Sequence, residues 1–322
     1  MVVTWFCRSL TSGVGILGLA WTVAGCSLSP PPEFDFSAQQ TRMVTRDAFD
    51  NLNPAWSPDG KTLAYVSNRA GSWNLWTVPV DGGDPQALTT GEGEDRFPAF
   101  SPDGTQLVFA SRRSGNWDIW VVNRDGTGLR QLTTHRMDDH APTWSADGSR
   151  IAFDSYRDFE YSIYVMDTDG TNQRKLTTGG NGDWGAAFHP SGETVVFAST
   201  RTGDGDIYAI DVNGAGPYRR LTVTEGEREM IPAFNQDGTK IAFVAERDGG
   251  RDIWAMAPDG TSQVRLTRNL SGAWEPRYSV DRQLYAAIGY FTLAWSPDGT
   301  AIAYTHVGSS GSGQISILSL AR

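Results

Sequence analysis

Cysteine is almost absent from this sequence, and that scarcity excludes two classes of protein. The 322 residues contain only Cys7 and Cys26, both near the N-terminus. The rest of the chain therefore has no disulfide framework and no cysteine metal site. Histidine is also scarce, with four residues, and none shows the paired spacing of metal ligands.

Long apolar runs are missing apart from one short stretch at the start. Met1 to Arg8 carries one positive charge and no acid, and an apolar segment follows from Val14 to Ala24. This segment is too short for a membrane span and ends in small residues, which is typical of a cleaved signal. The sequence predicts a signal peptide over residues 1–25.

The end of that segment, Val23-Ala24-Gly25-Cys26, resembles a bacterial lipobox. The resemblance implies that Cys26 is lipidated and becomes the mature N-terminus; an ordinary signal peptide containing a cysteine is the alternative. Residues 26–39 include Pro30-Pro31-Pro32, which predicts a semi-extended tether. We expect a protein of the cell envelope that contacts the membrane through its lipid only. Ser27 favours the periplasmic face of the outer membrane if the source is Gram-negative.

Basic residues are outnumbered, with 27 Lys and Arg against 37 Asp and Glu. The formal net charge is −10, and removal of residues 1–25 takes away one Arg and makes it −11. Such a chain repels phosphate backbones, so the sequence argues against a nucleic-acid partner.

What the sequence does contain is a repeat of about 44 residues. Pro54-Ala55-Trp56-Ser57-Pro58-Asp59-Gly60 returns with variation, and a Leu-Thr pair marks the end of each unit. The copies of the first motif begin at Pro98, Pro142, Ala186, Pro232 and Leu293, and the Leu-Thr pairs begin at Leu88, Leu132, Leu176, Leu221 and Leu266. Asp-Gly pairs stand where hairpin turns are needed.

Each unit reads as four short strands, which is the pattern of one propeller blade. The sequence therefore predicts an all-β fold, a six-bladed β-propeller of four-stranded antiparallel blades over residues 40–322. These motifs resemble the WD-like repeats of the TolB propeller family. TolB itself has an α/β domain before its propeller, whereas only the tether precedes the repeats here.

The two ends of the chain are expected to share the last blade. That blade lacks a fourth strand after Gln314–Leu320, and Arg42-Met43-Val44-Thr45 aligns with the fourth-strand residues Arg130–Thr133. An N-terminal strand would complete the sheet and remove an open edge. The spacing from Asp237 to Asp298 is too long for one unit, which predicts a partial duplication or an inserted hairpin between Ser271 and Tyr290. Which copy supplies the inner strand of blade six stays open.

Two repeated polar patterns suggest structure or function. An Arg recurs in Ser-x-Arg, for example Arg113, and an Asp or Asn recurs before the third strand, for example Asp118; we expect this pair to tie loops together. The second pattern is a polar residue three positions before the start of the first five copies of the blade motif. These residues are Asn51, Asp95, Asp139, Asp183 and Glu229. We expect these groups at one mouth of the channel, where they bind Ca²⁺ or a basic partner group, or else cap turns.

The position directly after each of these polar residues varies from blade to blade, whereas the motif around it is constant. Its residues are Leu52, Arg96, His140, Trp184, Met230 and Trp274. Arg96, His140, Trp184, Met230 and Trp274 are candidate contacts for a partner, because such side chains anchor interfaces; packing beneath loops is the alternative.

No catalytic constellation is recognisable, so we expect a binding scaffold that presents a propeller face to an envelope protein or a glycan, and not an enzyme. The alternative is a small propeller hydrolase or lyase that uses a metal held at the channel mouth.

Overall fold

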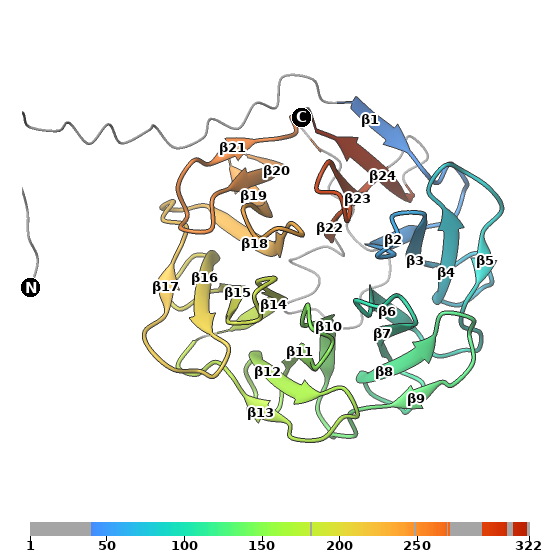
Figure 1. The fold of residues 1–322 in the computed structure, drawn as a ribbon, viewed down its shortest axis with the longest axis horizontal. Helices are drawn as coiled ribbons and strands as arrows, with labels where there is room; N and C mark the ends of the chain where they lie inside the picture. Colours follow the sequence, from blue (N-terminus) through green and yellow to red (C-terminus); the bar gives the residue numbers. More distant parts are fainter. Residues whose placement is uncertain are drawn as a thin grey trace, which may run out of the picture. The chain divides into compact units, whose positions relative to one another are not determined.

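The computed structural model describes residues 40–180, 182–247, 249–268, 270, 292–307 and 312–320. The predicted signal peptide and tether, Cys26, Trp274 and the expected insertion at 271–290 lie outside these ranges. Within them the chain forms six four-stranded antiparallel sheets arranged in a ring (Figure 1). No helix of sufficient length and apolarity to cross a membrane occurs in the described residues. The predicted six-bladed propeller is confirmed.

Each blade runs from an inner strand to an outer strand, in chain order for the first five. Blade one contains β2 (Asn51–Trp56), β3 (Thr62–Ser67), β4 (Asn74–Pro79) and β5 (Gln86–Ala87). Blade two contains β6 (Asp95–Phe100), β7 (Gln106–Ser111), β8 (Asp118–Asn123) and β9 (Arg130–Gln131). Blade three contains β10 (Asp139–Trp144), β11 (Arg150–Ser155), β12 (Ser162–Asp167) and β13 (Arg174–Lys175).

The other half of the ring follows the same plan. Blade four contains β14 (Asp183–Phe188), β15 (Thr194–Ser199), β16 (Asp206–Asp211) and β17 (Arg219–Arg220). Blade five contains β18 (Arg228–Phe234), β19 (Ile241–Arg247), β20 (Gly250–Met256) and β21 (Val264–Arg265). Blade six contains β22 (Leu293–Trp295), β23 (Ala301–Val307), β24 (Gly313–Ser319) and β1 (Gln40–Met43).

The Ser-Pro-Asp-Gly motif forms the hairpin turn between the first and second strands. In blade one the Ser57 hydroxyl donates to the Asp59 carboxylate at 2.5 Å and accepts the Thr62 N–H at 2.9 Å. Asp59 also accepts the Lys61 N–H. Gly60 has a φ of +69°, a left-handed conformation that glycine adopts without steric cost. The motif therefore satisfies its own backbone groups, which explains its recurrence.

The core lies between blades, because each sheet packs on both neighbours. The second strand is consequently buried on both faces, as in Leu63-Ala64-Tyr65-Val66, where every residue is 0% exposed. One large aromatic at the same position of five successive second strands fills this layer; the five are Tyr65, Phe109, Phe153, Phe197 and Phe243. Packing of these rings between sheets contributes to the apolar burial that holds neighbouring blades together.

The ring closes as the sequence predicts. β1 pairs antiparallel with β24, with Gln40 opposite Ser319 and Met43 opposite Ser316. The sheet order in blade six is β1-β24-β23-β22, so the N-terminal strand occupies the outer position (Figure 1). β22 pairs with β23 and is the inner strand, which answers the question that the sequence left open: the copy at 293–295 supplies it.

Candidate binding site around the central tunnel

The five polar residues expected at the channel mouth begin the inner strands of blades one to five. Asn51, Asp95, Asp139 and Glu229 are 0% exposed and Asp183 is 1% exposed. A buried carboxylate needs a cation or several donors to stay charged. The partner in this fold is an arginine from the same blade.

Four of these acids form short ion pairs with an arginine, which belongs to the Ser-x-Arg motif in blades two to four and stands in the equivalent position, Arg247, in blade five. The nitrogen–oxygen distances are 2.8 Å for Arg113–Asp95, 2.9 Å for Arg157–Asp139, 2.9 Å for Arg201–Asp183 and 2.7 Å for Arg247–Glu229. Each guanidinium also lies over aromatic rings of its blade; Arg201, for example, is 5.0 Å from the Tyr208 ring centroid and 3.7 Å from that of Tyr218. Ion pairing and cation–π contact together fix the arginine in place.

Blade one has Asn51 where the others have an acid, and the missing charge is supplied from nearby. Arg69 donates to the Asn51 amide oxygen at 3.1 Å and pairs with Asp47 at 2.7 Å. The Asn51 amide nitrogen in turn donates to Asp47 at 2.8 Å. At least one carboxylate therefore pairs with the arginine in each of the five blades, and Arg247 pairs with a second, Glu227, at 3.1 Å. The ion pair, more than the residue type, matters for this position.

The expected partner of the repeated arginine is wrong. Arg113 pairs with Asp95 on the first strand and not with Asp118 before the third. Asp118 instead accepts hydrogen bonds from Thr133 at 3.3 Å and Gln131 at 3.0 Å, both at the outer edge of its blade. Asp95 and Asp118 both lie opposite Ser111, on either side of the second strand, so the sequence pattern does not distinguish them and the folded structure shows which one pairs with Arg113.

Burial is the main cause of the raised pKa of two acids in these blades, Glu229 of the set above and Asp118 of the third strand. The pKa of Glu229 is raised by burial, although Arg247 opposes the shift. The pKa of Asp118 is also raised, first by burial and further by the nearby charge of Asp139. A role of the five residues in binding Ca²⁺ or a basic partner stays a prediction, and any such ligand would compete with the arginines already present.

The side chains proposed as partner contacts point into the protein. Arg96, His140, Trp184 and Met230 are 3%, 3%, 2% and 1% exposed. Arg96 lies over the Trp73 ring at 4.0 Å, and the rings of His140 and Trp117 are 5.1 Å apart. Packing between blades accounts for the positions of these four. Trp274 is outside the described residues.

The tunnel itself is lined by the residues that follow these acids along the inner strands. Two adjoining cavities of about 370 Å³ and about 400 Å³ share a set of aromatic side chains, one from each blade. The six are Trp56, Phe100, Trp144, Phe188, Phe234 and Trp295. The described lining residues include amides and hydroxyls, such as Asn53, Thr143 and Gln236, but no ionisable side chain. The tunnel wall therefore suits an uncharged or aromatic-contacting ligand.

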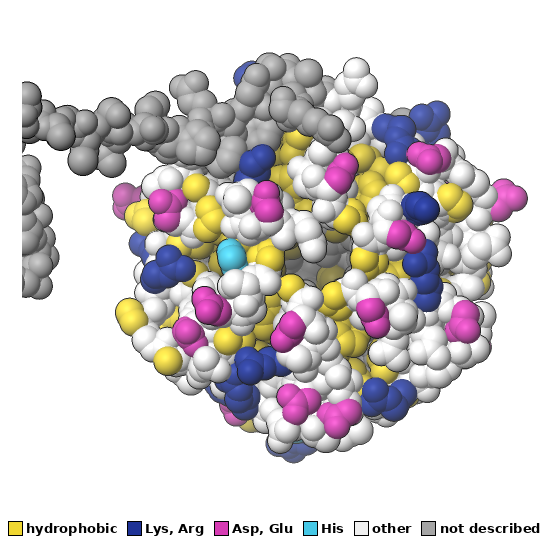
Figure 2. All heavy atoms as spheres, in the orientation of Figure 1, with side chains coloured by type: hydrophobic (Ala, Val, Ile, Leu, Met, Phe, Trp, Pro, Cys, Tyr) yellow, Lys and Arg dark blue, Asp and Glu magenta, His cyan; other side chains and the backbone are white. Residues whose placement is uncertain are grey.

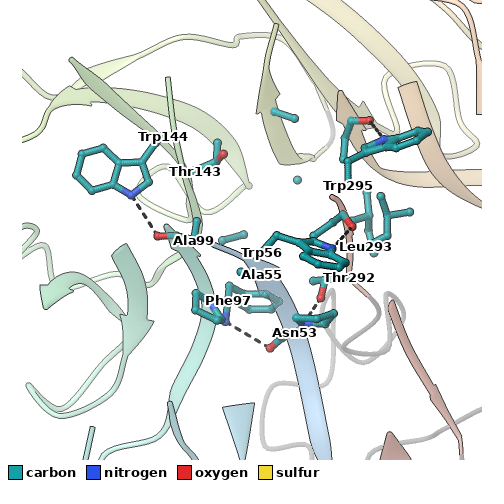
Figure 3. A pocket seen from close by; sticks show the side chains of 18 of the residues that line it. Asn53, Ala55, Trp56, Phe97, Ala99, Thr143, Trp144, Thr292, Leu293 and Trp295 are labelled. Carbon is teal, nitrogen blue, oxygen red and sulfur yellow. Dashed lines mark hydrogen bonds between the residues drawn. The ribbon is translucent and has the colours of Figure 1, made fainter. Parts of the chain in front are cut away.

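The three tryptophans of this ring tie neighbouring blades together. Trp56 donates its indole N–H to Ala294 O at 3.1 Å, Trp144 to Ala99 O at 3.2 Å, and Trp295 to Ala233 O at 3.1 Å (Figure 3). Each acceptor is on the inner strand of the preceding blade. The rings are thus held against the wall by directed bonds, which pre-organises the surface of the tunnel.

Sequence reasoning missed a bulge in the inner strands. The pairing of first and second strands shifts register in blades one to five, for example between His140 and Thr143. The residue at the bulge has positive φ in each: Asn53, Phe97, Ala141, Gly185 and Ile231, at 53°, 53°, 45°, 67° and 56°. Only Gly185 carries a sequence signal for that conformation. Some N–H groups of the bulge donate to side chains of the preceding blade, as the Gly185 N–H donates to Asp154 at 3.0 Å and the Phe97 N–H to Asn53 at 3.3 Å.

One mouth of the tunnel is bordered by the Ser-Pro-Asp-Gly turns, whose prolines line the second cavity. Hydrogen bonds from Ser145 and Ser149 lower the pKa of Asp147 to about 2, and Ser101 and Ser57 lower the pKa of Asp103 and Asp59. These turns stay anionic at neutral pH. On the face shown in Figure 2, acidic side chains surround the central hollow at intervals.

Comparison with known proteins identifies the family of this chain. The model of the TolB β-propeller domain matches residues 34–186, 136–231 and 182–289, which is most of the chain. The chain belongs to this family. The TolB resemblance drawn from the repeat motifs is confirmed.

Solved structures share the fold of this TolB-family propeller at low identity. A TolB-type protein from Agrobacterium tumefaciens is 22% identical with a TM-score of 0.66, over 87% of this chain and 94% of that one. A gluconolactonase from Xanthomonas campestris is 15% identical with a TM-score of 0.63, over 91% and 95%. An oligogalacturonate lyase in complex with manganese is 13% identical with a TM-score of 0.61, over 90% and 96%. At these identities the similarity shows the fold alone, which serves enzymes and other proteins alike.

Proposed function

We propose that this TolB-family chain is a lipid-anchored binding scaffold of the cell envelope, which presents one face of its propeller to a protein or glycan partner. The observation that carries the proposal is the chemistry of the tunnel wall. Its lining residues are prolines, alanines, aromatics, amides and hydroxyls, with no ionisable group among those described. Such a surface offers contacts for recognition.

The neighbouring carboxylates support the same conclusion. General acid–base catalysis needs a titratable group within hydrogen-bond reach of the reacting atoms, and metal catalysis needs ligands with an open coordination position. The acids that begin the inner strands instead face arginines at 2.7–2.9 Å. These pairs are repeated from blade to blade, which is typical of a structural role.

The membrane attachment is supported by Val23-Ala24-Gly25-Cys26 and the proline-containing tether. The lipid would hold the propeller at the periplasmic face of the outer membrane if the source is Gram-negative. No other membrane contact and no nucleic-acid partner are proposed, in keeping with the net charge of −10.

A propeller hydrolase or lyase with a metal at the channel mouth is the second candidate. The fold shared with the manganese-bound lyase favours it. In this chain Asp95, Asp139, Asp183 and Glu229 would be the residues nearest to the required chemistry, with Ca²⁺ as the cation that prefers their oxygens. The ion would have to displace arginine from each carboxylate that it bound.

Crosslinking followed by pulldown from native membranes tests the proposal. The full-length tagged chain should capture one specific envelope protein or glycan, and the purified protein should hold less than one metal ion per chain by elemental analysis. Chelator should leave its melting temperature unchanged. Stoichiometric metal, together with a chelator-sensitive hydrolase or lyase activity on oligosaccharides or lactones, would support the second candidate instead.

A further inference from the structure

The loop between the second and third strands closes with the same hydrogen-bonded turn in blades one to four, which makes the repeats a set of internal controls. In this turn the backbone N–H of one residue donates to the carbonyl oxygen of the residue three positions earlier, as in Gly71 to Asn68 O at 3.0 Å and Gly115 to Arg112 O at 2.9 Å. The residues at this position in blades one to five are Gly71, Gly115, Phe159, Gly203 and Gly249. Their φ angles are +89°, +114°, +62°, +107° and +72°.

Phe159 is thus a bulky residue in a turn that is otherwise made by glycine. Left-handed backbone brings a Cβ close to the following carbonyl oxygen, so only glycine occupies it without strain. The hydrogen bond of the turn is kept, from Phe159 N–H to Tyr156 O, but is longer at 3.2 Å. Local structure alone would favour glycine here.

Burial does not compensate for the strain, because the Phe159 side chain is 70% exposed. Its ring meets the Tyr156 ring edge-on, at a centroid distance of 6.5 Å, and Tyr156 lies 5.0 Å from Tyr161. Three aromatic residues therefore stand together within residues 156–161, a segment that we call the aromatic hook. A strained and exposed aromatic at one blade of a repeat points to contact with another molecule.

The charges around the aromatic hook are acidic. The Asp158 and Glu160 side chains are 53% and 39% exposed, and both face the single cation Lys175, at 2.8 Å and 3.7 Å. The remaining basic residue of the segment, Arg157, is paired with Asp139 inside the blade. Two carboxylates share one ammonium, which leaves negative charge beside the aromatic rings.

We propose that the aromatic hook is a docking surface for a peptide segment of a partner protein that carries a Lys or Arg next to an apolar side chain. The apolar side chain packs on Phe159, and the cation lies between the rings and Glu160, where both the ring faces and the carboxylate attract it. This inference rests on the proposed function, because it names the kind of partner and the place where it binds. The acidic net charge of the chain also favours encounter with a basic segment.

The central test is Phe159→Gly, which restores the residue found in the other four blades. A phage-displayed dodecapeptide library is selected on the wild-type chain and counter-selected on the Phe159→Gly chain. Recovered peptides are synthesised with a fluorophore and their Kd is measured by anisotropy. We expect peptides with a Lys or Arg beside an apolar residue, bound at least tenfold more weakly by Phe159→Gly, while the melting temperature of this variant equals or exceeds that of the wild type.

Two further variants sharpen the result. Val223→Ser removes another apolar side chain, 71% exposed and outside the aromatic hook, and should leave peptide binding unchanged. Glu160→Lys reverses an exposed charge and removes the Glu160–Lys175 pair, and it should weaken binding of the basic peptides at low salt. The proposal is overturned if no peptide depends on Phe159, if the dependent peptides lack a basic residue, or if Phe159→Gly lowers the melting temperature.

The membrane pulldown separates this inference from the proposed function. A partner captured equally by wild type and Phe159→Gly would leave the scaffold function standing and overturn the aromatic hook. Failure of the wild type to capture any partner would count against the scaffold function itself. A glycan-array signal that disappears in Phe159→Gly would overturn the assignment to a peptide.

Discussion

The Thr45 hydroxyl accepts a hydrogen bond from the backbone N–H of Ile315 at 2.9 Å, across 270 positions of the chain. The same bond occurs locally in the other five blades, for instance from Ile119 to Thr133 at 2.9 Å over 14 positions. Blade six therefore reproduces a local contact with residues from opposite ends of the sequence. Closure of the ring depends on it and on the β1–β24 ladder.

Deletion of residues 40–46 should lower the free energy of unfolding by several kcal/mol, because it removes a ladder of backbone hydrogen bonds and exposes the edge of β24.

Thr45→Val should lower the free energy of unfolding by about 1–3 kcal/mol, since it leaves the buried N–H of Ile315 without an acceptor. Thr177→Val is the matched control, because it breaks the same bond, from the Ile163 N–H to the Thr177 hydroxyl, within a single blade. Urea unfolding measures all three. A deletion variant as stable as wild type would show that β1 does not close the ring.

Asp183→Asn should destabilise the fold by about 3 kcal/mol, because it leaves the guanidinium of Arg201 buried without its counter-ion. Arg201→Met should have a cost of similar size. The double variant should be less destabilised than the two single costs added together, since no unpaired charge remains. A double-mutant cycle from urea unfolding gives this coupling. Unchanged stability in Asp183→Asn, together with weaker binding of Ca²⁺ or a partner, would instead support a ligand role for the acid.

Stability should fall as the pH drops below about 6.5, through His140. Burial first, and the charge of Arg112 second, lower the pKa of His140 to about 3. A depressed histidine pKa means that the unfolded chain binds the proton first, so the contribution is complete above the unfolded pKa and is lost as the pH falls toward the folded pKa. The loss between pH 7 and pH 5 should be about 2 kcal/mol.

Chemical denaturation at several pH values checks this linkage. His140→Phe should flatten the profile between pH 7 and pH 5. His189→Asn is the control, because Asn235 occupies the equivalent turn of blade five and accepts the Lys240 N–H at 2.8 Å. A slope that persists in His140→Phe would assign the pH dependence to another group.

Cys26→Ala should move the protein from the membrane to the soluble fraction, because the lipobox-like sequence then lacks the thiol that carries the lipid. Membrane fractionation and mass spectrometry of the mature N-terminus measure the change. An unmodified N-terminus at a residue other than 26 in the wild type would be evidence for an ordinary signal peptide.

The sequence by itself determined the architecture. Repeats such as Pro98–Gly104 carry their own turn chemistry, and their number and spacing require six similar sheets. Even the closure of the ring could be predicted, because Thr45 keeps the fourth-strand pattern. Local hydrogen bonding and strand periodicity encode these features, so they are visible in short windows of sequence.

Tertiary structure alone decided how the polar side chains are used. Asp95 on β6 and Asp118 on β8 both lie opposite Ser111, two residues before Arg113, yet it is Asp95 that pairs with the arginine. Arg96 and His140 look like surface anchors in sequence and are buried, since each blade is covered by the next. The strain at Phe159 likewise appears only in the backbone angle, although the glycines at the equivalent positions of four other blades mark where to look.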